Sequence, residues 1–307
     1  MKKNKLILLL ILLLLIGLYF LLRTKQPQEK LLPVFDLDTL AINRIEIYDA
    51  QDTLKMVKQG NCWRLIYPVN WEADSLKIHS LFKDILTAKY SKTPMGTGKE
   101  AILKFHQRDE ETLHLIVSDG KKTVHTLFSN LNNPYDYFRY AGSEEIYQVK
   151  TKVTNVYNTD LANWRSPHIV SHQENDLVKI EVTHPKNKYT LTRKGLDWYY
   201  QDAHQNFQIH PYNRAMIKIL NILEHLDTYI FVDNAQAEYA AKFDDPYCTV
   251  KLFLTNNRTQ DLKFIEHYQG HYLMMVDNDP TVLFVVVWDT VFRFTRPPDV
   301  FRMQELG

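Results

Sequence analysis

Residues 45–63 read IEIYDAQDTLKMVKQGNCW, and residues 180–198 read IEVTHPKNKYTLTRKGLDW. The two stretches align without a gap at an offset of 135 residues. In each, alternating apolar and polar residues predict two strands joined by a turn, and a glycine then precedes a strand that carries a tryptophan. The matching positions are Ile45 and Ile180, Glu46 and Glu181, Ile47 and Val182, Met56 and Leu191, Lys58 and Arg193, Gly60 and Gly195, Trp63 and Trp198. The alignment predicts two copies of one building unit.

The glycine and the tryptophan of each copy are typical of structural positions. Glycine suits a turn that needs a positive φ. Tryptophan is a large apolar anchor for the buried face of a sheet. We therefore expect Trp63 and Trp198 to be buried in equivalent places.

A helix is predicted after each repeated stretch. In the first copy Asp74 is a good N-cap, and apolar residues follow at helical spacing from Leu76 to Leu86. In the second copy we expect His210 to cap the helix and Pro211 to be its first residue. Each helix has one apolar stripe, which suits packing across a sheet, although a helix that lies between the repeats would have the same pattern.

Strand patterns follow both predicted helices. In the first copy they cover residues 101–105, 113–117, 124–128, 137–140 and 146–149, and in the second 250–254, 262–265, 272–276 and 282–288. Asp119-Gly120 and Gln269-Gly270 mark tight turns between strands. The run 282–288 is uniformly apolar and short, which favours a strand buried on both faces, although an interface edge would have the same pattern. The fold class is therefore α+β.

The start of the chain has the pattern of a membrane anchor. Residues 6–22 are free of charged side chains and are flanked by lysines before and by Arg23 and Lys25 after. A helix of this length would span about 25 Å, enough for a thin bilayer. A cleaved signal peptide is the alternative, but its apolar region is usually shorter and ends in small residues. With the amino terminus in the cytoplasm, the body would face outward, in the periplasm.

These patterns give an expected domain organisation. It consists of a cytoplasmic tail at 1–5, a transmembrane helix at 6–22, a stalk at 23–39, an α+β repeat at 40–157, a connector at 158–177 and a second α+β repeat at 178–303. We expect a mainly antiparallel sheet with one packed helix in each repeat. We expect the two repeats to touch, because the connector is poor in glycine and serine.

Charge and cysteine content exclude some classes of protein. Six of the 37 basic residues but one of the 36 acidic residues precede residue 31, so the body is mildly acidic. Nucleic-acid binders have a basic face, and we therefore expect no nucleic-acid partner. Cys62 and Cys248 do not form a disulfide framework; buried free thiols are the simpler interpretation, with a disulfide between the repeats as the alternative.

No pattern in the sequence predicts an enzyme, a metal or a cofactor. Residues 96–99 lack the spacing and the hydroxyl of a phosphate loop. His267 and His271 lie on a predicted hairpin turn without a third ligand, whereas a catalytic zinc needs three. The acidic pairs at 244–245 and at 277 and 279 lie next to prolines, where they favour turns. We expect no catalytic, cofactor-binding or metal-binding residues.

Tyrosines supply the only candidate contact surface in the sequence. Tyrosine-rich surfaces suit protein or sugar contacts, although period-two spacing in a sheet also explains these residues. The candidates are Tyr135, Tyr137, Tyr199, Tyr200 and Tyr212.

The assembled features resemble the bacterial membrane proteins grouped as domain of unknown function 4340. The resemblance is carried by Ile45, Ile47, Gly60, Trp63, Ile180, Val182, Gly195, Trp198 and the segments 146–149 (IYQV) and 243–246 (FDDP). A Gly-Leu-x-x-Pro-like turn that the family would place near residues 95–99 is missing. Members are often encoded beside transporters of the ATP-binding-cassette (ABC) type, including gliding-motility ones. The resemblance therefore implies an accessory role at the cell envelope.

Two functions are consistent with the sequence. The first is a non-enzymatic protein, anchored in the inner membrane by residues 6–22, that acts as an accessory or scaffold for an envelope complex through a protein partner. The second is a binding module for a peptide, glycan or lipid-linked ligand, held by the tyrosines in a cleft between the repeats.

Overall fold

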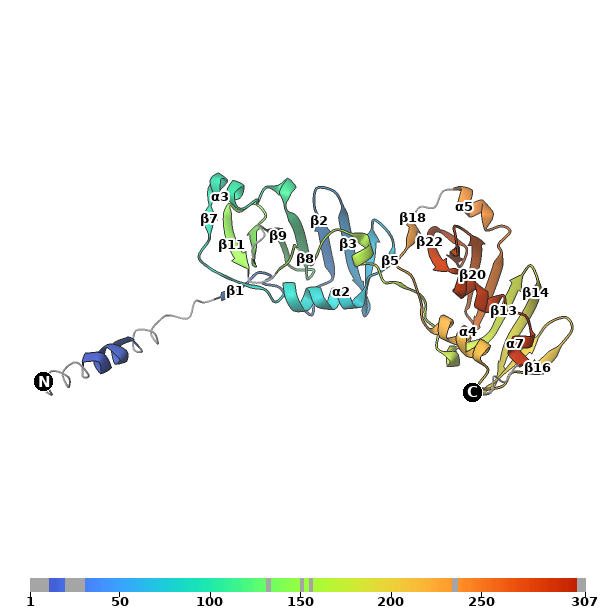
Figure 1. Cartoon of the computed structure of the whole chain (residues 1–307). Helices are drawn as coiled ribbons and strands as arrows, with labels where there is room; N and C mark the ends of the chain where they lie inside the picture. The colour runs from blue at the N-terminus through green and yellow to red at the C-terminus, as the bar shows by residue number, and fades with distance from the viewer. Residues whose placement is uncertain are drawn as a thin grey trace. The chain divides into compact units, whose positions relative to one another are not determined.

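The structure is a computed structural model, and it describes residues 11–19, 31–130, 134–149, 152–154, 157–233 and 237–302. The chain divides into two compact units, with the boundary between Arg165 and Ser166 (Figure 1). The boundary lies inside the segment expected to connect the repeats.

Unit 1 is built on one antiparallel sheet. Its strand order is β1-β6-β11-β10-β9-β8-β2-β3-β4-β5, and β7 also pairs with β11. The strands are β1 (Leu31–Pro33), β2 (Arg44–Tyr48), β3 (Thr53–Gln59), β4 (Cys62–Tyr67), β5 (Trp71–Glu72), β6 (Lys89–Ser91), β7 (Gly96–Thr97), β8 (Leu113–Ser118), β9 (Thr123–Ser129), β10 (Asp136–Tyr140) and β11 (Glu145–Val149).

Unit 2 repeats this arrangement. Its sheet has the order β16-β15-β14-β13-β19-β20-β21-β22-β18, and a small ribbon pairs β12 (His168–Val170) with β17 (Leu226–Asp227). The strands of the sheet are β13 (Leu177–His184), β14 (Asn187–Lys194), β15 (Asp197–Gln201), β16 (Asn206–Gln208), β18 (Phe231–Asp233), β19 (Cys248–Leu254), β20 (Thr259–Glu266), β21 (His271–Val276) and β22 (Asp279–Val287). The series β5-β4-β3-β2-β8-β9-β10-β11 thus corresponds, strand by strand, to β16-β15-β14-β13-β19-β20-β21-β22.

The repeated stretch has the same strand register in both units. Ile45 lies opposite Met56 in the β2–β3 pair, and Ile180 lies opposite Leu191 in the β13–β14 pair. Strand register fixes which side chains face the core, since a shift of one residue turns every side chain to the other face. The two aligned sequences therefore form the same hairpin with the same buried face.

The glycine and tryptophan of each copy occupy the predicted positions. Gly60 and Gly195 have φ angles of 61° and 67°, which lie in the left-handed region. Trp63 and Trp198 are buried, with exposed fractions of 9% and 5%. The structural interpretation of the repeated stretch is confirmed.

The helix of each unit follows four corresponding strands, β2–β5 in unit 1 and β13–β16 in unit 2. In unit 1, α2 (Ser75–Ser80) continues into a π-helical segment, η1 (Leu81–Ile85), and the Asp74 carboxylate accepts hydrogen bonds from the Leu76 and Lys77 amides at 2.8 and 3.0 Å, as predicted for its cap. In unit 2, α4 (Arg214–Glu224) begins later than predicted. The prediction of His210 as its cap is wrong. His210 starts a turn closed by the amide of Asn213, which caps the helix.

Further short helices lie outside the two predicted ones. They are α3 (Gly98–Lys104), α5 (Ala237–Lys242), α6 (Trp288–Phe294) and α7 (Asp299–Arg302), with single 3₁₀ turns η2 (Asp109–Glu111), η3 (Leu161–Asn163) and η4 (Glu174–Asp176). One packed helix per repeat was therefore too few.

Two of these helices replace predicted strand. Residues 101–105 were predicted as a strand but belong mostly to α3. Ala101 and Phe105 lie one helical turn apart and are both buried in a small cluster with Tyr137 and Ile146. Positions 101 and 105 share a face in a helix as well as in a strand, and Leu103, which a strand would bury with them, is 52% exposed in the helix. Trp288 was predicted at the end of a strand but begins α6.

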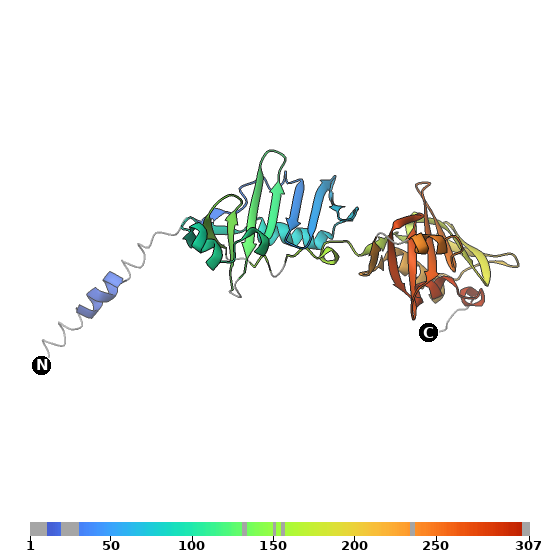
Figure 2. The same ribbon diagram turned by 90° about the horizontal axis from the view of Figure 1, so that it is seen from above.

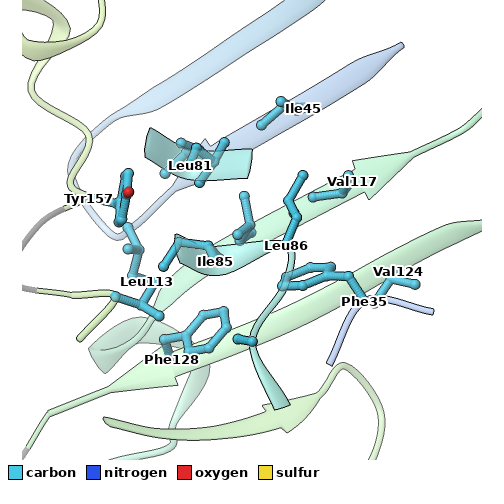
Figure 3. Packing of buried hydrophobic residues seen from close by; sticks show 14 of the residues in the cluster. Phe35, Ile45, Leu81, Ile85, Leu86, Leu113, Val117, Val124, Phe128 and Tyr157 are labelled. Atoms are coloured by element: carbon cyan, nitrogen blue, oxygen red, sulfur yellow. The ribbon is translucent and has the colours of Figure 1, made fainter. Parts of the chain in front are cut away.

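The core of unit 1 lies between its sheet and the segment formed by α2 and η1, which runs along one sheet face (Figures 1 and 2). Figure 3 shows Leu81, Ile85 and Leu86 of this segment among Ile45 and Val117 of the sheet. The segment is short, but Ile78, Leu81 and Ile85 on its inner face are almost completely buried. Burial of this face, rather than helix propensity, accounts for its stability.

The uniformly apolar strand of unit 2 is buried on both faces over residues 283–286. Leu283 and Val285 pack in a cluster with Phe243, Ile265 and Leu273. The two residues of 283–286 that alternate with them face the opposite side of the sheet. Two-sided burial is thus confirmed for the centre of β22, whereas Val287 is about half exposed at its end.

Only part of the predicted anchor lies within the described residues. Residues 11–19 are helical and exposed, and the other positions of 6–22 lie outside the described part of the chain. Among the described residues, no helix combines the length and the apolar character needed to cross a membrane. Residues 31–39 were expected to form the end of a stalk but belong to unit 1: β1 pairs with β6, and Val34 and Phe35 are buried.

The two cysteines are free thiols in different environments. Cys248 lies in the core, and its burial raises the pKa of the thiol to about 12. Cys62 is exposed at the β3–β4 turn, so the expectation that both are buried is wrong for this residue.

Candidate functional site

Two of the five candidate tyrosines lie inside the cores. Tyr137 is 7% exposed, with its ring centroid 4.7 Å from that of Phe105. Tyr200 is completely buried, and its hydroxyl donates a hydrogen bond to Asp202 at 2.9 Å and accepts one from Asn187 at 2.8 Å. Burial raises the pKa of the Tyr200 hydroxyl above its ordinary value. These side chains are structural and do not form a contact surface.

The other three candidate tyrosines reach the surface. Tyr212 is 81% exposed in the turn before α4, and Tyr135 is 38% exposed before β10. Tyr199 is half-buried, with the Lys194 ammonium 4.9 Å from its ring centroid. Alternation along β15 explains why Tyr199 and Tyr200 differ, since neighbouring strand residues face opposite sides.

The histidines considered as metal ligands and the acidic pair at 277 and 279 lie at turns between strands. His267 and His271 flank Tyr268 at the β20–β21 turn, where the rings of Tyr268 and His271 stack at 4.4 Å. The Asp277 carboxylate accepts a hydrogen bond from the Asp261 amide at 2.9 Å, and that of Asp279 accepts one from the Thr281 amide at 2.9 Å. Within the described ranges, no three or more His, Cys, Asp or Glu side chains are grouped so that they could hold a metal ion.

A polar cluster lies on the face of the unit 1 sheet opposite the main core. His114 and His125 are joined by a hydrogen bond of 3.0 Å between Nδ1 and Nε2, and the ring of Tyr48 stacks on His114 at 4.2 Å. Buried Arg139 forms an ion pair with Asp109. Burial and the neighbouring His114 ring lower the pKa of His125. The cluster ties the segment after α3 to the sheet, which is a structural role.

A hollow beside Trp63, which we call the Trp63 hollow, is a surface depression of unit 1 with a mainly apolar lining. It has a volume of about 410 Å³ and lies between the β3–β4 turn and α2. Trp63 and Phe82 line it, with ring centroids 5.8 Å apart, together with Ile78 of α2. Leu40 borders the hollow and is 88% exposed. Charged and polar groups complete its lining through Lys58, Glu72 and His79.

A second depression, which we call the basic pocket, lies in unit 2. It has a volume of about 280 Å³ and is formed by the first turns of α4 and the segment from α6 to α7. Four of its lining residues are cationic, namely Arg214, Lys218, Arg293 and Arg296, and the others are Asn213, Ala215 and Val300.

Comparison with known protein families identifies the chain. The family model described as domain of unknown function (DUF4340) matches residues 63–246, more than half of the sequence. The chain belongs to the DUF4340 family. No curated protein and no solved structure matches it. The resemblance seen in the sequence is therefore confirmed, and the matched range of this DUF4340 chain includes Trp63 of the Trp63 hollow and both Arg214 and Lys218 of the basic pocket.

Sequence reasoning did not find either depression. Arg214 and Lys218 are four residues apart, and Arg293 and Arg296 are three apart, so each pair could have been placed on one helix face. The two pairs converge because α4 packs against α6, and no local sequence pattern predicts this contact. Leu40 similarly approaches Trp63 only through the fold.

Proposed function

We propose that this protein is a non-enzymatic accessory or scaffold protein of a bacterial envelope complex, anchored in the inner membrane by residues 6–22 with its body in the periplasm. An ABC-type transporter or a gliding-motility system is the candidate partner. The apolar run flanked by basic residues supports the anchor. The family resemblance supports the envelope setting.

The observation that carries the proposal is the Trp63 hollow. An aromatic and aliphatic floor with charged side chains around it is the usual anatomy of a protein contact site, in which an apolar centre is surrounded by a polar rim. Leu40 is 88% exposed beside that floor and extends its apolar surface, whereas the similarly exposed Leu196 of unit 2 lines neither this hollow nor the basic pocket. An apolar side chain of the partner protein would fill the hollow and cover Leu40.

Site-specific photo-crosslinking in native membranes tests this function. A photoreactive amino acid replaces Leu40 in the full chain, and the matched control carries it at Leu196, which is 87% exposed in the β14–β15 turn of unit 2. We expect one discrete crosslinked protein from position 40 and none of that mass from position 196. The product should fade when Ile78 at the hollow is changed to Glu, provided that circular dichroism shows a folded chain.

Three results would refute the proposal. Equal crosslinking from both positions would indicate non-specific contact. Recovery of the monomer alone, without a crosslinked protein from position 40, would show that no protein partner contacts this position. A reporter fused after Gly307 that is active only in the cytoplasm would overturn the orientation.

A further inference from the structure

The basic pocket brings together cations from two distant parts of the sequence. Arg214 and Lys218 lie on α4, whereas Arg293 and Arg296 lie at the end of α6 and just after it. None of the lining residues named for it in the described part of the chain is acidic. Like charges that converge on one pocket create a positive potential, which favours the entry of an anion.

The walls of the pocket are held in place by hydrogen bonds of its own lining residues. The Asn213 side chain accepts a hydrogen bond from the Met216 amide at 3.0 Å and donates one to the Val300 carbonyl at 2.8 Å, which ties the start of α4 to α7. The Arg293 guanidinium donates two hydrogen bonds to Asp289, at 2.6 and 3.1 Å. The site is therefore built before any ligand arrives, which lowers the entropic cost of binding.

Positive charge remains in the pocket after the ion pair of Arg293 with Asp289, which is not a lining residue, is counted. Asp289 offsets Arg293. The Arg296 guanidinium lies 4.9 Å from the ring centroid of Phe292, and this stacking leaves its N–H groups available at their edges. Within the described residues, no carboxylate pairs with Lys218 or Arg296. An anion would therefore meet at least two cationic side chains that are not neutralised.

We propose that the basic pocket of unit 2 binds the phosphate group of an anionic ligand. A phosphate has several acceptor oxygens and can take hydrogen bonds from guanidinium groups on two sides, with Lys218 as an added point charge. The apolar part of the lining consists of Ala215 and Val300, which offer little surface to an apolar ligand. The phosphate supplies the affinity, and it can belong to a lipid headgroup or to a soluble compound.

Calorimetric titration of the full chain in detergent micelles tests the proposal. The two probes are inorganic phosphate and short-chain phosphatidylglycerol below its micelle-forming concentration, with short-chain phosphatidylcholine as the zwitterionic control. We expect saturable binding of at least one anionic probe. Tighter binding of phosphatidylglycerol identifies a lipid source, and equal or tighter binding of inorganic phosphate identifies a soluble source.

Matched variants assign the binding to the pocket. The double variant K218Q/R296Q should weaken binding at least tenfold. The control K188Q/R258Q removes the same charge at exposed positions of unit 2 outside the pocket, and should change the affinity less than twofold. Arg296→Lys retains the charge and should bind within several-fold of the natural chain, so it keeps the test valid if the double variant fails to fold.

Two outcomes would overturn the inference. One is the absence of saturable binding of both anionic probes. The other is an equal loss of affinity in K218Q/R296Q and K188Q/R258Q, which would show that net charge rather than the pocket attracts the anion. The test is independent of the Trp63 hollow, so its failure leaves the proposed protein partner untouched.

Discussion

The contact between the helical segment and the sheet of unit 1 predicts a large difference between two leucines on one helix. Leu81 is completely buried, at 0% exposure, whereas Leu76 is 78% exposed, one and a half turns earlier. We compare Leu81→Ala with Leu76→Ala. Both changes remove the same atoms from the same helical segment, so helix propensity nearly cancels between them.

The expected loss follows from burial. Removing three buried carbon atoms costs about 2.4 kcal/mol in transfer free energy, at about 0.8 kcal/mol each. The cavity left behind adds to this, because sheet and helix collapse only in part, and brings the total to about 3–4 kcal/mol. Leu76→Ala should change the free energy of unfolding by less than about 0.5 kcal/mol.

Urea and thermal unfolding followed by far-ultraviolet circular dichroism measure the difference. For a unit of this size, Leu81→Ala should lower the melting temperature by roughly 6–15 °C. The melting temperature of Leu76→Ala should stay within about 2 °C. Equal effects of the two substitutions would show that the helix does not pack on the sheet through Leu81, and the described core would then be wrong.

Three further predictions rest on single contacts. The pKa of His125 in the folded chain lies below its ordinary 6.5, so below that pH the unfolded chain binds more protons than the folded chain. The contribution of His125 to the free energy of unfolding is therefore lost as the pH falls through 6.5. The urea midpoints at pH 8 and pH 5 should differ less in His125→Gln than in the natural chain. The Tyr189 hydroxyl donates a buried hydrogen bond of 2.7 Å to the Phe294 carbonyl, and Tyr189→Phe should cost about 1–3 kcal/mol by calorimetry, because the carbonyl loses its partner. Asp74→Ala should cost about 1 kcal/mol in urea unfolding because two amides at the start of α2 lose their acceptor; an unchanged midpoint would contradict the capping role.

The fold was predictable from the sequence where local pattern and burial agree. The Ile45 and Ile180 hairpins combine strand alternation with a turn glycine, and both signals hold in the structure. Alternation failed around Ala101, because Ala101 and Phe105, four residues apart, also fit one face of a short helix, on which Leu103 points outward and is 52% exposed. His210-Pro211 is a plausible helix start by composition, but the chain turns there and Asn213 supplies the cap.

The candidate sites were less predictable, because each depends on distant residues. Tyrosine content indicated a contact surface, yet alternation within the sheet buries Tyr200 and leaves Tyr199 half-exposed. The basic pocket joins α4 to the chain after α6, and nothing in either segment alone distinguishes its arginines from solvated ones. Local sequence patterns predict many of the strands and the two main helices, whereas the contacts between side chains of distant elements depend on the topology.

The strand order has a consequence for how each unit is made. β2 pairs with β3 on one side and with β8 on the other, so the strand that starts the repeat lies in the middle of the sheet. During synthesis one edge of β2 stays unpaired until the ribosome has produced the helix and β8. Pairings between strands so far apart in the sequence slow folding. The same holds for β13 and β19. A fragment cut at Trp63 and Pro246, the limits of the family match, would lack β2 in one unit and β19 in the other. Neither sheet could then form completely.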